Sequence, residues 1–217
     1  MKMTSERKYA LVIVLVLCVV AIVGCGGMNS APAASTSSTF PVATQSASTS
    51  TEQPVPVVNP TQASGSDIPD TQVFVTYASS QGHYQLEVPE GWAQKTNGTD
   101  VSFDNNLNSL QVTLADATTR PTASSVRNDQ AVTLQRTGRA IRDVRVQDMQ
   151  LPNGPAVLIT YTSNSDANPV TNKQVRLENN RYLFFQNGKL AILTLSAPVG
   201  ADNVDQWARI ARSFKWV

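Results

Sequence analysis

Apolar and polar residues alternate in short runs through the second half of the chain, which is the pattern of half-buried β-strands. The run at 156–162 is apolar on both faces and therefore predicts a central strand that is covered on both sides. Alternating runs lie at residues 84–88, 101–103, 110–114, 144–146 and 175–178.

Turn residues separate these runs where a sheet requires them. Pro89-Glu90-Gly91 and Pro152-Asn153-Gly154 each end a run, and Asn187-Gly188 lies between the apolar runs 182–185 and 190–195. Asn-Gly is a strong hairpin signal, because both central residues of a tight hairpin turn need positive φ. The turns therefore predict antiparallel strand pairing.

Two stretches follow helical spacing instead. Residues 122–137 place Val126, Gln130, Ala131 and Leu134 on one side, with Thr122 or Ser124 as the expected N-cap. Near the C-terminus, Asp202 is the expected N-cap of a helix with an apolar stripe made of Trp207, Ile210, Ala211 and Phe214. The order of elements predicts an α+β fold, with an antiparallel sheet covered by helices on both faces (an α/β/α sandwich).

The N-terminus has the pattern of an export signal. Lys2, Arg7 and Lys8 precede an apolar run at 10–23, which is shorter than the ~20 residues that a membrane-spanning helix needs. Residues 22–25, Ile-Val-Gly-Cys, resemble the lipobox of bacterial lipoproteins. The resemblance implies cleavage before Cys25 and a lipid on its thiol; an uncleaved signal anchor is the alternative.

Composition divides the chain into three parts. We expect a lipoprotein signal peptide at 1–24, a disordered Ser/Thr/Pro-rich tether at 25–72 and a globular domain at 73–217. From 26 to 72 there is no Lys or Arg, and too little apolar surface to offset the entropy of ordering. The predicted location is the extracytoplasmic face of the cell membrane, with the membrane contacted through the lipid anchor.

Charge and cysteine content exclude several classes of function. A net charge of +1 gives no electrostatic reason to expect nucleic acid as a partner. The cysteines, Cys18 and Cys25, both precede the predicted domain, which can therefore form neither a disulfide nor a thiolate metal site.

Candidate site residues outside the N-terminus each have a structural alternative. His83 is the only histidine, and Glu87 would lie about 13 Å away on the same face of a strand, so a surface role is favoured over a metal role. Arginines 127, 136, 139, 142 and 145 could bind anionic headgroups or polymers, or simply form a solvated face. Three tryptophans could stack on sugars; Trp92 and Trp207 are expected in the core, which leaves Trp216 as the exposed candidate.

Two stretches carry motifs of a known fold. One is 82–92, Gly-His-Tyr-Gln-Leu-Glu-Val-Pro-Glu-Gly-Trp; the other combines Gly188-Lys189, the run 190–195, Ala197-Pro198 and 207–214. Both stretches resemble the PsbP-like family. The family includes PsbP and bacterial lipoproteins of the DcrB and LpqN kind. The resemblance implies an antiparallel sheet between helices and a non-catalytic binding or accessory role, with divalent-ion binding in some members.

The sequence contains no nucleophile motif, paired-carboxylate signature, phosphate loop or metal-ligand spacing. We therefore predict a non-enzymatic lipoprotein without cofactor or metal, which binds an envelope protein or a small ligand. A lipid or hydrophobic-ligand carrier with a cavity between sheet and helix is the alternative, and a cell-wall hydrolase is a third.

Overall fold

The computed structural model describes residues 52–57 and 66–217. The predicted signal peptide, the predicted lipid-attachment residue Cys25 and most of the predicted tether lie outside these residues. The described elements are β1 (Phe74–Ser79), β2 (Tyr84–Pro89), β3 (Ala93–Asn97), β4 (Asp100–Asn105), β5 (Asn108–Asp116), α2 (Ala123–Asn128), α3 (Gln130–Thr137), β6 (Arg142–Leu151), β7 (Gly154–Asn164), β8 (Arg176–Gln186), β9 (Lys189–Pro198), α4 (Val204–Ser213) and β10 (Lys215–Trp216).

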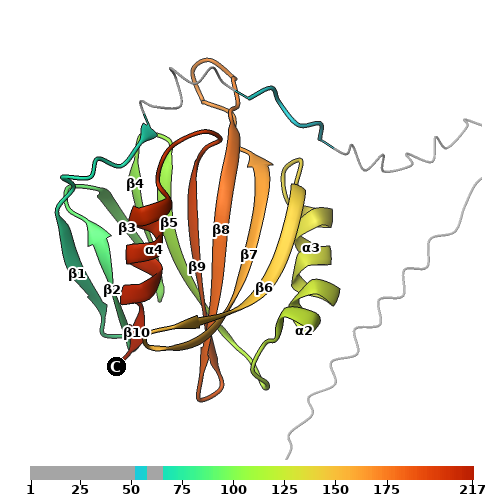
Figure 1. The fold of residues 1–217 in the computed structure, drawn as a ribbon. Coiled ribbons are helices and arrows are strands. Elements are labelled where there is room, and N and C mark those ends of the chain that lie inside the picture. The colour runs from blue at the N-terminus through green and yellow to red at the C-terminus, as the bar shows by residue number, and fades with distance from the viewer. Residues whose placement is uncertain (1–51, 58–65) are drawn as a thin grey trace, which may run out of the picture. The chain divides into compact units, whose positions relative to one another are not determined.

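Within the described residues, the strands form two antiparallel sheets (Figure 1). The larger has seven strands in the order β3-β4-β5-β9-β8-β7-β6, and the smaller has the order β1-β2-β10. The predicted Asn187-Gly188 hairpin joins β8 to β9, with φ values of 48° and 80°, and Gln186 pairs with Lys189 across it. This prediction is confirmed, and it fixes the register of the two central strands.

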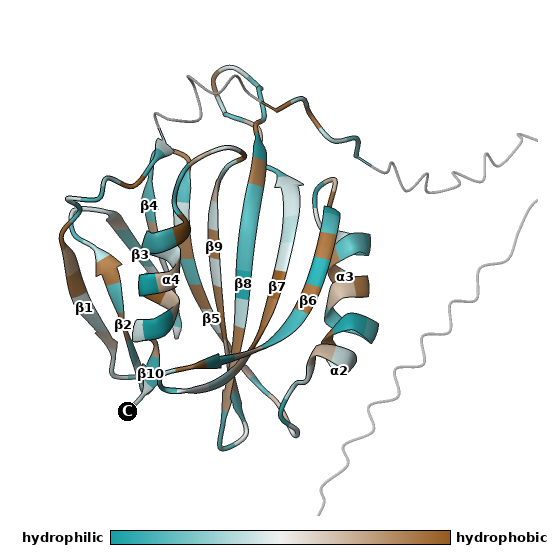
Figure 2. Ribbon diagram, viewed as in Figure 1, coloured by the Kyte–Doolittle hydropathy of each residue, from teal (hydrophilic) through white to brown (hydrophobic). Residues whose placement is uncertain are grey.

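The largest buried cluster lies where the two sheets and α4 meet. Apolar side chains of the larger sheet alternate with polar ones (Figure 2), and those on one face pack against β2 and α4. Phe214 links the layers: its ring stacks on Phe184 of β8 at 4.0 Å and on Tyr84 of β2 at 5.5 Å between centroids. Trp207 and Ile210 of α4 are buried in the same cluster.

A second, smaller cluster lies at the β6–β7 side of the larger sheet. The short helices α2 and α3 contact β6 and β7 there, and Val126 of α2 is buried. Its main sheet residues are Val157, Ile159, Tyr161 and Leu183. The predicted central strand at 156–162 is thus covered on both sides, because alternate residues of β7 enter the two clusters.

The coarse prediction of an α+β fold with an antiparallel sheet is supported, but the predicted sandwich with helices covering both faces is not found. One covering layer is mainly the three-stranded sheet, which α4 joins at β2, and the short helices α2 and α3 lie mainly against β6 and β7. The pattern missed β3 because all five of its residues are exposed, so no alternation marks it. In the part of the chain that the structure describes, no helix is long and apolar enough to span a membrane.

Both helix predictions need a correction, the first in its middle and the second at its N-terminus. The stretch 122–137 is two helices, because Asp129 leaves helical geometry with φ −121° and ψ −75°. Thr122 is the N-cap as predicted, since its side chain accepts from the backbone N–H of Ser125. The N-cap of α4 is Asn203 and not Asp202. The Asn203 side chain does not cap the helix but accepts a hydrogen bond from the Ile68 N–H at 2.6 Å.

The packed domain begins before the predicted boundary at residue 73. Ile68 is 3% exposed and belongs to the larger core cluster, and Ser66 is buried as well. The Asn108 amide donates to the Ser66 carbonyl at 2.7 Å. The sequence predicts residues 66–72 as part of the tether, because a single isoleucine in a polar stretch gives no apolar period. The residues that bury Ile68 are distant in the sequence.

We expect Ile68→Ala to lower the free energy of unfolding by about 2–4 kcal/mol, because a buried side chain is removed and a cavity remains. Urea unfolding of the full chain measures this. Val57→Ala is the matched control, since Val57 is 56% exposed. Equal stability of the two variants would contradict the packing of residues 66–72 as part of the domain.

Candidate functional site

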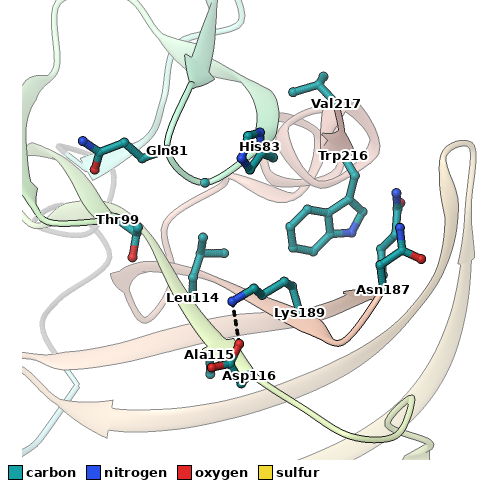
Figure 3. A pocket seen from close by; sticks show the side chains of 12 residues that line it. Gln81, His83, Thr99, Leu114, Ala115, Asp116, Asn187, Lys189, Trp216 and Val217 are labelled. Carbon is teal, nitrogen blue, oxygen red and sulfur yellow. Dashed lines mark hydrogen bonds and ion pairs between the residues drawn. The ribbon is translucent and has the colours of Figure 1, made fainter. Parts of the chain in front are cut away.

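A pocket of about 500 Å³ opens at the end of the larger sheet that carries the β8–β9 turn. Segments far apart in the sequence surround it: the turn before β2, the turn between β3 and β4, the end of β5, the β8–β9 hairpin and the C-terminal residues (Figure 3). The side chains that give it chemical character are Gln81, His83, Leu114, Asp116, Lys189 and Trp216.

The turn before β2 depends on Gly82. Its N–H donates to the Ser79 hydroxyl at 3.0 Å, and a Cβ on Gly82 would lie 2.5 Å from Cε1 of the buried Tyr84 ring. His83 follows with φ +53°, in the left-handed region where few residues other than glycine lie and where Asn, Asp and His are enriched. Its side chain is exposed, and its carbonyl accepts from the Val217 N–H at 2.9 Å. The turn thereby holds His83 and the C-terminus on the same side of the pocket.

An ion pair crosses the opposite side of the pocket. Asp116 and Lys189 face each other in the β5–β9 register, and their carboxylate and ammonium groups lie 2.6 Å apart. The two side chains are 84% and 60% exposed, so the pair contributes only about 0–1 kcal/mol to stability. Both charges are consequently available to a ligand that offers a competing partner.

Trp216 forms an apolar wall of the pocket together with Leu114. It lies in β10 opposite Tyr84 of β2, and its ring packs edge-on against Phe214 at 5.6 Å. The side chain is half-buried, so one part supports the core cluster while another faces the pocket (Figure 3). An indole held in this way suits stacking against a ring or an alkyl chain.

Glu87, the residue considered as a metal-binding partner of His83, is bonded elsewhere. Glu87 accepts from Arg209 of α4 at 2.6 Å, so its carboxylate is engaged elsewhere. Among the described residues, no group of three or more His, Cys, Asp and Glu side chains could hold a metal ion. His83 lies instead in a pocket, next to residues that only the tertiary structure brings together.

The five candidate arginines do not form one patch. Arg127 of α2 donates to the Val146 carbonyl, and Arg142 donates to the Ile141 carbonyl. Arg139 lies in the loop after α3, between two carboxylates, those of Glu52 and Asp166, each at 3.5 Å. The break between α3 and β6 divides the row, and backbone acceptors and nearby carboxylates engage these three guanidinium groups.

The prediction of core tryptophans is confirmed for Trp207 and only partly for Trp92. Trp207 is 6% exposed, whereas Trp92 is half-buried and packs against the same cluster. Trp216 is more buried than an exposed aromatic would be, yet it is the one of the three that lines the pocket.

Local pattern gave no reason to select Leu114, Asp116 or Lys189. Leu114 lies in an alternating strand and looked like an ordinary core residue, while Asp116 and Lys189 looked like strand-end charges. The register of β5 against β9 brings these residues together, and that register joins segments more than 70 residues apart.

Two further features bear on the alternative functions. A more apolar groove of about 410 Å³ runs past Pro121, Met149 and Phe185 on the surface. Among the described residues, Glu178 is the carboxyl group whose pKa is raised, and burial causes the shift.

No protein-family model matches the sequence, and no curated protein matches it. Among solved structures, the chain is similar to the cyanobacterial PsbP protein (CyanoP) of Synechocystis sp. PCC 6803, with 16% identity and a TM-score of 0.49 over 70% of this chain and 98% of that one. It is also similar to the Ran-binding protein Mog1p of Saccharomyces cerevisiae, with 11% identity and a TM-score of 0.46 over 68% of this chain and 97% of that one.

A third similar structure is LpqN of Mycobacterium tuberculosis, a protein involved in cell envelope biogenesis, with 12% identity and a TM-score of 0.40 over 67% of this chain and 85% of that one. PsbP and LpqN are two of the kinds of protein that the sequence motifs resemble. Similarity at this level assigns neither a family nor an activity, so the function is argued from the site.

Gly82→Ala is expected to destabilise the domain by about 1–3 kcal/mol, because the added methyl group would overlap the Tyr84 ring, which is buried and stacked on Phe214. The matched control is His83→Ala, which removes an exposed side chain and should change stability by less than about 0.5 kcal/mol. Urea unfolding measures both. A Gly82→Ala protein as stable as the wild type would show that the turn does not need glycine.

Proposed function

We propose that this protein is a non-catalytic binding module, anchored to the extracytoplasmic face of a membrane by a lipid on Cys25, which binds a segment of an envelope protein at the pocket beside Trp216. The anchor rests on the resemblance of residues 22–25 to a lipobox. The binding role rests on the pocket.

One observation carries the binding role: the pocket combines a half-buried indole with charges that are only weakly committed to each other. Its volume of about 500 Å³ is within the range of sites that hold small molecules or a few side chains. The mixed lining fits an amphiphilic occupant, such as a peptide segment with one apolar side chain and one charged group. Hydrophobic contact with Trp216 would give affinity, and Lys189 and Asp116 would give orientation.

A hydrophobic-ligand carrier is the second candidate, favoured by the apolar groove between Pro121 and Phe185. Such a carrier is expected to enclose its ligand between sheet and helix. Aromatic rings fill that space near α4, where Phe184 and Phe214 stack at 4.0 Å. The groove lies at the surface instead, and for this reason the binding module is preferred.

The anchor is tested by labelling cells with a radioactive fatty acid. The wild-type protein should carry the label, and Cys25→Ala should not, because the thiol that accepts the lipid is absent. Cys18→Ala is the control and should be labelled normally. Equal labelling of wild type and Cys25→Ala would exclude the anchor.

The pocket is tested in intact cells with a photo-crosslinking amino acid at Gln81, which is exposed and lines the pocket, or at Lys95, which lies on the edge strand β3. A specific adduct is expected from position 81 only. Lys189→Ala and Trp216→Ala should each reduce its yield about tenfold or more, if the residues contribute as ordinary interface anchors.

Circular dichroism shows whether these two variants remain folded; the Lys189 side chain is 60% exposed and should tolerate the change. An adduct that forms equally from both crosslinking positions, or that persists at full yield in both variants, would rule out this pocket as the binding site.

A further inference from the structure

The opposite end of the larger sheet holds a second constellation of polar side chains, where β7 ends and β8 begins. Figure 2 shows that this end of β8 is hydrophilic. Asn164 and Arg176 face each other in the β7–β8 register and are only 3% and 5% exposed. Two buried polar side chains at the rim of a sheet need full hydrogen bonding, and residues 52–57 supply part of it.

Asn164 contacts the backbone of this segment on both sides of Pro54. Its Nδ2 donates to the Gln53 carbonyl at 2.8 Å, and its Oδ1 accepts from the Val55 N–H at 3.0 Å. Pro54 has no N–H to compete, and its fixed φ limits the entropy lost when the segment docks. These two bonds depend on backbone groups, so they recognise a chain in a particular conformation.

Arg176 sets the orientation of the Asn164 amide. Its guanidinium donates to Asn164 Oδ1 at 3.1 Å and to the Ala140 carbonyl at 2.7 Å. Because a guanidinium can only donate, the amide oxygen must face Arg176, and the NH₂ group is left to donate to the segment. The three acceptors described for Arg176 are uncharged, and the third is the Thr162 hydroxyl. The Asp143 carboxylate is close enough to act on this guanidinium through its charge.

The acidic residue of the segment occupies the positive side of this site. Oε1 of Glu52 accepts from Gln174 Nε2 at 2.8 Å and from Asn164 Nδ2 at 2.9 Å. Arg139 lies 3.5 Å from the same carboxylate and also contacts Asp166. The hydrogen bonds from Asn164 and Gln174 lower the pKa of Glu52, and the Arg139 charge acts in the same direction.

We propose that Asn164, Gln174 and Arg139, supported by the buried Arg176, form a peptide-binding site for an acidic segment with proline two residues after the glutamate, and that residues 52–57 of this chain are its ligand. Docking holds the N-terminal tether at one end of the sheet. The pocket beside Trp216 opens at the other end of β8, which has 11 residues and is therefore roughly 35 Å long. The site stands on its own contacts and does not depend on what the pocket binds.

The first test removes one backbone donor of the segment in the full chain. Val55→Pro deletes the N–H that donates to Asn164 Oδ1. Val57→Pro is the matched control, because no hydrogen bond is described for Val57. NMR titration of the Glu52 carboxyl should show its lowered pKa rising toward the ordinary glutamate value in Val55→Pro and staying lowered in Val57→Pro, as expected when the docked segment opens. An unchanged Glu52 pKa in Val55→Pro, or an equal rise in both variants, would overturn the proposal.

The second test uses the vacated site. A fluorescein-labelled peptide of residues 50–59 should bind the full-chain double variant Glu52→Gln/Val55→Pro, and bind the wild type at least about tenfold more weakly, because the tethered segment competes at high effective concentration. The same peptide with Glu52→Gln should bind about tenfold more weakly, since a charge-assisted hydrogen bond is lost. Failure of the unmodified peptide to bind the double variant, or equal binding to both proteins, would overturn the site.

Acid should release the segment. Docking lowers the pKa of Glu52, so its contribution is fully present above the ordinary glutamate pKa and is lost as the pH falls through the lowered value. The Val55 amide exchange rate of the full chain should rise over that range in the wild type and stay pH-insensitive, after correction for intrinsic exchange, in Glu52→Gln. A dimer in sedimentation experiments that dissociates in Val55→Pro would show docking between two copies and overturn docking within one chain.

Discussion

The stacking of Phe214 between Phe184 and Tyr84 is the contact on which the rest of the molecule depends. It joins the C-terminal segment to both sheets, with ring centroids 4.0 Å and 5.5 Å apart. Aromatic contacts of this kind add to the free energy of burial of three large side chains. They also place β10 beside β2, and β10 carries Trp216. The pocket exists because the core brings the chain end back to the turn at Gly82.

The two ends of the central strands differ in chemistry for a structural reason. At the β8–β9 turn, strand ends project an indole and an exposed ion pair around an open pocket, where side chains remain free to change partners. At the β7–β8 end, Asn164 and Arg176 are buried and their bonds are directed, so the site is preorganised. Preorganised polar sites recognise a defined backbone, whereas open amphiphilic pockets accept a broader range of occupants.

Sequence patterns predicted the strands with alternation and the Asn187-Gly188 hairpin, because these depend on neighbours within a few residues. They failed where a strand has no apolar face, as in β3, and where a helix is interrupted by one residue, as at Asp129. The alternating run at 175–178 predicts Arg176 on the polar face of its strand, but the side chain is 5% exposed. Its burial is decided by Ala140 and Asn164, which come from other parts of the chain, and no local signal reports them.

By itself, the sequence determined the parts whose physics is local: the short apolar run before Cys25, most of the alternating strands, a helix cap at Thr122 or Ser124 and the lack of metal-ligand spacing. Only the tertiary structure decided that Ile68 belongs to the core, that Lys189 meets Asp116, and that Glu52 lies against Asn164. Those outcomes depend on strand register and on layers closing over one another. Register is set by the summed burial of many side chains, and no short stretch of sequence contains that sum.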